Sequence, residues 1–205
     1  MKQINKYIVE RLHINKDIGK QNNHYNYHPT TRDELKELVD QLVKERGNEA
    51  DLNDIDTSKI TNMSELFFKS KFNGDISNWD VSNVTDMIGM FEHSEFTGKN
   101  GDISNWDVSN VKNMSYMFMV SKFNGDISNW NVSNVEDMCY MFTTSEFNGD
   151  ISKWNVSKVI NMGTMFANSK FNGDISEWDV SKVININYMF YKSPLEKNPP
   201  KWYKN

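Results

Sequence analysis

The chain has 205 residues and a formal net charge of −5, and 38% of its residues are hydrophobic and 13% aromatic. Its mean hydropathy of −0.70 is typical of polar or disordered chains, yet 6 Trp, 12 Phe and 12 Met require a core to bury them. The single cysteine, Cys139, excludes an intramolecular disulfide and a zinc site built on paired cysteines. No apolar run approaches the roughly 18 residues needed to span a bilayer, so we expect no membrane insertion.

Residues 1–29 are expected to form a leader helix followed by a loop. An apolar face over residues 3–13 predicts the helix and consists of Ile4, Tyr7, Ile8 and Leu12. Residues 19–29 are rich in asparagine, which is typical of a loop. Charged side chains recur every few positions from the start, and no lipobox-like cysteine is present, so the opening does not fit a secretory signal or a lipoprotein signal.

Residues 30–50 predict a capping helix. Thr31 is its expected N-cap, Glu34 completes a capping box, and Gly47 ends it. An apolar stripe lies between these signals and consists of Leu35, Leu38, Val39, Leu42 and Val43. Because this helix leads directly into the following repeats, we expect it to cover their N-terminal end.

Residues 51–193 contain a repeat, whose unit FNGDISNWDVSNV recurs almost unchanged. Tryptophans recur every 24 residues from Trp106 to Trp178, while the step from Trp79 to Trp106 is 27 because residues 97–100 form a longer loop. Ile55 occupies the Trp position of an atypical first unit, and Trp202 follows Trp178 by one period. We therefore expect about six coils of 24 residues.

The apolar positions of one coil are constant, and in the coil that begins at residue 72 they are Phe72, Ile76, Trp79, Val81, Val84, Met87, Met90 and Phe91. Stacked copies of such a unit bury one continuous core. The pattern predicts an α/β repeat solenoid with short parallel strands and one helical or 3₁₀ turn per coil, the turn falling on the M-x-x-M-F segment. A glycine column is expected to need positive φ or close backbone approach, and it comprises Gly74, Gly101, Gly125, Gly149 and Gly173.

Residues 194–205 are expected to form a capping tail. Pro194, Pro199 and Pro200 lack the amide that a further coil would need for pairing.

The repeat unit FNGDIS-x-W-[DN]-VS-[NK]-V-x-[DN]-M-x-x-MF resembles the BspA-like leucine-rich repeat family, in particular its mycoplasma-type branch of surface proteins and lipoproteins. The resemblance implies a leucine-rich-repeat-like solenoid and, in characterised relatives, adhesion or binding to host proteins. The opening INKYIVERLHINKD is also similar to a leader on assorted proteins of phages that infect gut Bacteroidetes. Because no export signal is evident, we expect this chain in the cytoplasm or a phage virion rather than on a Sec-exported cell surface.

Two repeated columns admit a functional and a structural interpretation. The Trp column could offer aromatic rings to a sugar, but Ile55 in the same position favours a core ladder. An aspartate after each glycine could hold a calcium ladder or, as we favour, accept hydrogen bonds from turn amides; this column is Asp75, Asp102, Asp126, Asp150 and Asp174. The asparagine column that contains Asn83, Asn110 and Asn134 is expected to be structural in the same way.

Nothing in the sequence assembles an enzyme site. His24 and His28 stand four apart without further metal ligands, and Cys139 has no neighbouring base, so we expect no catalytic residue, metal or cofactor. Residues 51–205 carry a net charge of −6 against +1 for residues 1–50. An acidic repeat region without a basic stripe argues against nucleic-acid partners and anionic membranes.

The positions that vary between coils are the candidates for a protein-contact face. Freed from the demands of the repeat, they lie beside the M-x-x-M-F segment and include Tyr116, Met119, Tyr140, Tyr188 and Tyr191, residue types enriched in interfaces. The alternative is drift at solvated positions. Ile160 and Ile184 are expected to pack under the tail or against another subunit.

The sequence therefore predicts a non-enzymatic protein-interaction scaffold with a protein partner. The alternatives are a structural or virion-associated protein of a bacteriophage that infects gut bacteria and, as a third, a surface adhesin for host protein or carbohydrate.

Overall fold

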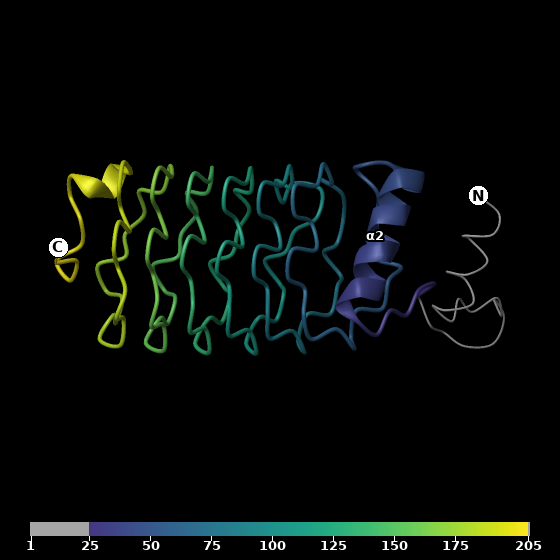
Figure 1. Cartoon of the computed structure of the whole chain (residues 1–205), viewed down its shortest axis with the longest axis horizontal. Helices are drawn as coiled ribbons and strands as arrows, with labels where there is room; N and C mark the ends of the chain where they lie inside the picture. Colours follow the sequence, from purple (N-terminus) through teal and green to yellow (C-terminus); the bar gives the residue numbers. More distant parts are fainter. Residues whose placement is uncertain (1–24, 205) are drawn as a thin grey trace.

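The computed structural model describes residues 25–204. The chain runs through successive coils placed side by side along its long axis, with helix α2 (Arg32–Arg46) across one end and the 3₁₀ helix η1 (Pro194–Glu196) at the other (Figure 1). The expected leader helix over residues 3–13, the INKYIVERLHINKD segment and His24 lie outside the described residues.

Helix α2 begins and ends where the sequence predicts. The Thr31 Oγ1 accepts a hydrogen bond from the Glu34 amide at 3.3 Å, which confirms the N-cap. The Glu34 carboxylate binds the amide and hydroxyl of Thr30, at 2.8 and 2.9 Å, instead of the Thr31 amide that a capping box would use. Gly47 ends the helix with its amide on the Val43 carbonyl. The apolar stripe packs inward, with Leu35, Leu38, Val39 and Leu42 buried and Val43 partly buried.

The coils pair through isolated parallel bridges rather than strands. Five bridges join equivalent positions of successive coils: Asn62 with Asp86, Asp86 with Asn113, Asn113 with Asp137, Asp137 with Asn161, and Asn161 with Asn185. Within residues 25–204 no longer strand is formed. The expectation of short strands is therefore reduced to single paired residues.

The expected helical turn on the M-x-x-M-F segment is wrong. In the coil with residues 138–142, the amides of Met138, Tyr140 and Phe142 donate to carbonyls of the next coil, while the Met141 amide donates to the Met138 carbonyl within its own coil. The reason is a left-handed residue, Tyr140 with φ +58°, that a right-handed helix cannot contain. With a left-handed residue in the segment, alternate amides point toward the next coil. Hydrogen bonds between coils therefore replace the hydrogen bonds of a helix.

These segments give the stack a direction. In every coil from Met63 to Asn168, the outward amides of the M-x-x-M-F segment donate to carbonyls of the next coil toward the C-terminus. This part of each coil therefore presents N–H groups toward the C-terminal end of the stack and carbonyl groups toward the N-terminal end.

Aromatic columns fill the core. One column stacks with ring centroids 5.4–6.0 Å apart and consists of Phe67, Phe91, Phe118, Phe142, Phe166 and Phe190. A second runs beside it through Phe72, Phe96, Phe123, Phe147 and Phe171. The five repeat tryptophans are only 3–4% exposed, and each donates its indole N–H to a backbone carbonyl of the preceding coil, as Trp130 does to Ile103. The core interpretation of the Trp column is confirmed. Trp202 continues the ladder to the Ile175 carbonyl at 2.8 Å.

The glycine column needs space, not positive φ. None of its five members has positive φ; the glycines that do are Gly47, Gly89 and Gly98. A Cβ on Gly74 would lie 2.0 Å from the Ala50 carbonyl oxygen, and one on Gly149 would lie 2.9 Å from the Phe147 ring. Close backbone approach is confirmed for Gly74 and Gly101, whereas the other three glycines lie against a phenylalanine ring of their own coil. The positive-φ interpretation is wrong.

The two ends of the stack are covered unequally. At the N-terminal end, helix α2 covers the first coil, and the Arg32 Nε donates to the Ser64 carbonyl at 2.9 Å. At the C-terminal end, Pro194 occupies the position at which Glu146 and Lys170 donate their amides to the preceding coil, and it has no amide to donate. Trp202 and Tyr203 pack on Phe190, so the tail covers the aromatic columns.

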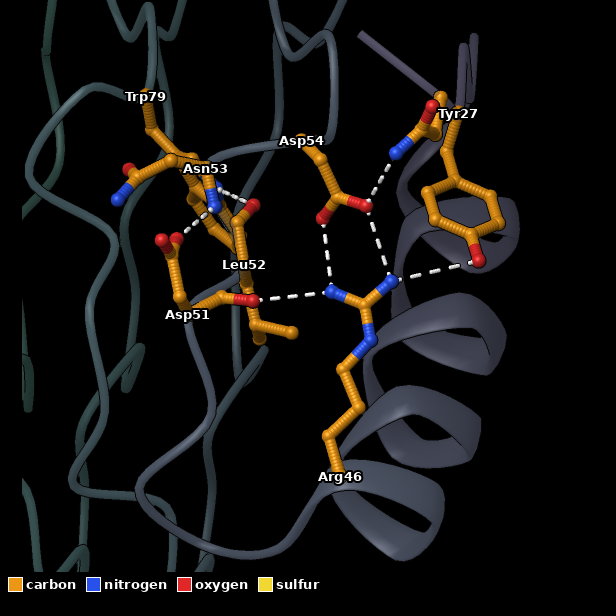
Figure 2. A network of polar contacts seen from close by, with 8 residues as sticks. Tyr27, Arg46, Asp51, Leu52, Asn53, Asp54 and Trp79 are labelled. Atoms are coloured by element: carbon orange, nitrogen blue, oxygen red, sulfur yellow. Dashed lines mark hydrogen bonds and ion pairs between the residues drawn. The ribbon is translucent and has the colours of Figure 1, made fainter.

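A polar network joins helix α2 to the first coil. Figure 2 shows the Arg46 guanidinium reaching from the helix to the Asp51 carbonyl and to both carboxylate oxygens of Asp54, each at 2.9 Å. Asn26 also donates to Asp54, at 2.9 Å, and Tyr27 lies 3.4 Å from Arg46. Burial of the Asp54 carboxyl opposes its ionisation, but the bonds from Arg46 and Asn26 outweigh burial and lower its pKa.

Asp54→Asn is expected to destabilise the fold by about 2 kcal/mol at neutral pH, because it removes a bidentate charged pair. The folded-state pKa of Asp54 is lowered, so its contribution is fully present above the ordinary carboxyl pKa of about 4 and is lost as the pH falls below it. Urea unfolding over this pH range should therefore show that the difference in unfolding free energy between wild type and variant becomes smaller as the pH falls.

The control is Asp40→Asn, which removes an exposed carboxylate from the same helix. If the loss of unfolding free energy caused by Asp54→Asn stays constant with pH, the stabilising role of the ionised Asp54 carboxylate is contradicted.

Candidate functional site

The five residues of the predicted contact face form two separate groups. The rings of Tyr116 and Tyr140 stack with centroids 4.8 Å apart and an interplanar angle of 6°, and both are half-buried, as is Met119. Tyr188 and Tyr191 meet edge to face at 6.2 Å and are 70% and 45% exposed. Thr164 and the buried Ala167 hold the equivalent positions in the coil between the two groups. The structure thus brings each pair together but does not join the pairs.

These positions are not free of structural demands, so that expectation is wrong. Tyr116, Tyr140 and Tyr188 have φ of +61°, +58° and +57°, a conformation that Gly89 adopts in the same slot. For a residue with a Cβ this conformation costs about 1–2 kcal/mol. The second slot is buried in two coils, at Thr143 and Ala167. The backbone and the core therefore restrict both slots.

The exposed large hydrophobic side chains gather in the last two coils. Ile184 is 85% exposed, and Ile160, Tyr188 and Tyr191 are the others among the described residues. Ile184 does not pack under the tail, contrary to that part of the expectation. A hollow of about 590 Å³ lies at the two tyrosines and is lined by Asn187, Tyr188, Phe190, Tyr191, Glu196, Pro199 and Tyr203.

Sequence reasoning missed the edge that these residues border. In the last coil the amides of Ile186, Tyr188, Phe190 and Lys192 are equivalent to Met162, Thr164, Phe166 and Asn168, which donate to the next coil. Within residues 25–204 these four amides have no acceptor. The signal was available, because the repeat ends here and the tail that follows is too irregular to supply matching carbonyls. We call residues 184–192 the C-terminal edge.

The polar columns of the repeat are structural. In each aspartate of the column the Oδ1 accepts the amide of a serine two residues later at 2.9 Å, as Asp126 does from Ser128, which confirms the turn interpretation. The serine amide is the main cause of the lowered pKa of Asp126, Asp150 and Asp174. The asparagine column is a ladder too, since Asn83, Asn110 and Asn134 donate to serine carbonyls of the preceding coil.

The remaining reactive groups are few. Burial, followed by the hydrogen bond to Asp137, raises the pKa of Cys139 to about 12, so its thiol is neutral near pH 7. His28 lies 3.1 Å from Asp56. In the part of the chain that the structure describes, no three His, Cys, Asp or Glu side chains are grouped closely enough to ligate one metal ion. The described helices include none with the length and apolar character required to cross a membrane.

Comparison with known proteins identifies one family. Its model, described as "Mycoplasma protein of unknown function, DUF285", matches twice in overlapping stretches, over residues 34–144 and 94–202. No curated protein and no solved structure matches the chain. The two stretches together include most of helix α2, every coil and most of the tail, and on this match the chain belongs to the DUF285 family of mycoplasma-type repeat proteins of unknown function.

Proposed function

We propose that this protein is a non-enzymatic protein-interaction scaffold, a leucine-rich-repeat-like solenoid that binds its partner through the flank formed by its last coils. Membership of a repeat family is consistent with this role. The Cys139 thiol is neutral near pH 7, and the aspartates of the column accept hydrogen bonds within turns. Both observations are consistent with structural roles for these residues.

Tyr188 carries the proposal. Its backbone is left-handed with φ +57°, yet the side chain is 70% exposed, and within residues 25–204 its only ring contact is Tyr191. For Tyr116 and Tyr140, ring stacking offsets part of the backbone cost. Tyr188 has no such stacking partner among the described residues, and an aromatic side chain exposed to this extent is typical of a binding surface.

The test is a quantitative pull-down from the native cells, followed by calorimetry with the purified partner. The double variant Tyr188→Ala/Tyr191→Ala is expected to weaken partner binding at least tenfold, since aromatic anchors dominate interfaces. Phe68→Ala, which removes a half-buried aromatic near the other end, is the control and should bind like wild type. Equal binding by wild type and the double variant, or no partner retained by wild type, contradicts the proposal.

A virion-associated role is the second candidate, favoured by the leader-like opening INKYIVERLHINKD. Mass spectrometry of purified virions distinguishes the two, since a structural component would be present at a fixed ratio to the capsid protein. The adhesin alternative loses its carbohydrate platform, because the Trp column is buried.

A further inference from the structure

The C-terminal edge offers a row of donors without acceptors. The amides of Ile186, Tyr188, Phe190 and Lys192 alternate along the chain, as the amides of each earlier coil do. One coil earlier, such amides bond to the carbonyls of Asn185, Asn187, Met189 and Tyr191, which are alternate residues of a polypeptide. The edge therefore has the spacing to pair with alternate carbonyls of another polypeptide segment.

The segment that forms this edge and the following tail has a net charge opposite in sign to that of the whole chain, while Asp174 and Glu177 of the last coil line one hollow with Lys201. Residues 180–204 contain five basic side chains and one acidic side chain, a net charge of +4 in a chain whose total is −5; the basic ones are Lys182, Lys192, Lys197, Lys201 and Lys204, and the acidic one is Glu196. Amide donors and ammonium groups both attract carboxylates.

A second copy of the chain fits this edge poorly. Two C-terminal edges facing each other would oppose donors to donors and positive charge to positive charge. In a head-to-tail arrangement the carbonyl end of the second copy is covered by helix α2, with Arg32 bonded to the Ser64 carbonyl.

We propose that the C-terminal edge binds an acidic segment of a partner protein, which adds itself to the stack as a partial further coil. Its alternate backbone carbonyls accept from the four amides, its carboxylates lie near Lys192 and the tail lysines, and its apolar side chains contact Ile184, Tyr188 and the hollow beside Tyr191. Trp202 already occupies the Trp position, so only the M-x-x-M-F side of the edge is open. This inference rests on the proposed function and specifies its partner class.

The test uses the full chain and a short oligoglutamate peptide, with oligoglutamine of the same length as the uncharged probe. In NMR titration, oligoglutamate is expected to shift the amide signals of Ile186, Tyr188, Phe190 and Lys192. The double variant Lys192→Glu/Lys197→Glu should weaken this binding by about tenfold. Lys59→Glu/Lys71→Glu changes the total charge equally at exposed positions near the other end and should leave the affinity unchanged.

Three results would overturn the inference: equal binding of both peptides, shifts outside the edge, or equal loss in both lysine variants. Tighter binding of a single-stranded oligonucleotide would assign the edge to nucleic acid instead, and a dimer in light scattering that buries these amides would assign it to a second copy. If oligoglutamate fails while the Tyr188→Ala/Tyr191→Ala variant still loses its protein partner, the proposed function stands and only the acidic partner class is wrong.

Discussion

Replacing Phe118 with alanine is expected to reduce the free energy of unfolding by about 3–5 kcal/mol, because the side chain is fully buried at the centre of the aromatic core. Its ring stacks on four neighbours, and these are Phe91, Phe123, Phe142 and Trp130, with centroids 4.3–6.3 Å away. Removing the ring leaves a cavity that the neighbouring coils cannot fill, since their backbones are held in register by the bonds between coils. Urea denaturation followed by tryptophan fluorescence measures the loss.

Phe68→Ala makes the same chemical change outside the columns and serves as the control. Phe68 is half-buried, and its aromatic and cation–π contacts with the described residues are those to His93 and Lys69, so its loss should cost about 1 kcal/mol or less. Phe190→Ala should lie between the two, because Phe190 has a phenylalanine neighbour on only one side. Similar losses for Phe118→Ala and Phe68→Ala would contradict a core that depends on continuous aromatic stacking.

The columns could be predicted because a repeat places chemically equal residues at equal positions. Once Trp106 and Trp130 are seen 24 residues apart, their neighbours must stack as well, and burial of the column follows from Ile55 in the same position. The aspartate turns were predictable for a local reason, since a carboxylate followed two residues later by a serine amide closes a turn without help from the rest of the fold.

The path of the backbone through the M-x-x-M-F segment could not be predicted in the same way. Its spacing of apolar residues fits one turn of helix, and only Gly89 signals a left-handed residue in this slot. In the other coils the slot holds Glu65, Tyr116, Tyr140, Thr164 and Tyr188. Bonds to the next coil decide the conformation, and local propensity does not contain them. For the same reason the contact face was expected at unconstrained positions, whereas Tyr188 differs from Tyr116 and Tyr140 because it has the same left-handed backbone and yet is 70% exposed.

The C-terminal edge is a second feature that local sequence does not predict in full, because it depends on how the whole tail packs. A stack of coils has two ends that must be covered. The sequence predicts both covers, the helix at residues 32–46 and the proline-rich tail. Whether such a cover also accepts hydrogen bonds from the backbone amides of the last coil depends on where the cover lies. The tail packs Trp202 and Tyr203 on Phe190 and leaves the amides beside Tyr188 without acceptors among the described residues. The end of the repeat signals an open edge, but which amides stay open depends on the three-dimensional arrangement.

Gly74→Ala is expected to destabilise the fold by about 3 kcal/mol, close to the effect of a core truncation although only one methyl group is added. The new Cβ would lie 2.0 Å from the Ala50 carbonyl oxygen, a backbone atom that accepts the Asp75 amide and so cannot move away freely. The bridge between Asp51 and Asp75, which attaches the first coil to the second, would have to open. Gly163→Ala is the matched control, because its nearest contact is the side-chain nitrogen of Asn185, and the same slot holds Ile88, Ser115 and Cys139 in other coils. That substitution should cost about 1 kcal/mol or less. Thermal and urea unfolding of both variants decides the matter: equal and small losses would mean that the first two coils are not packed as closely as the structure requires.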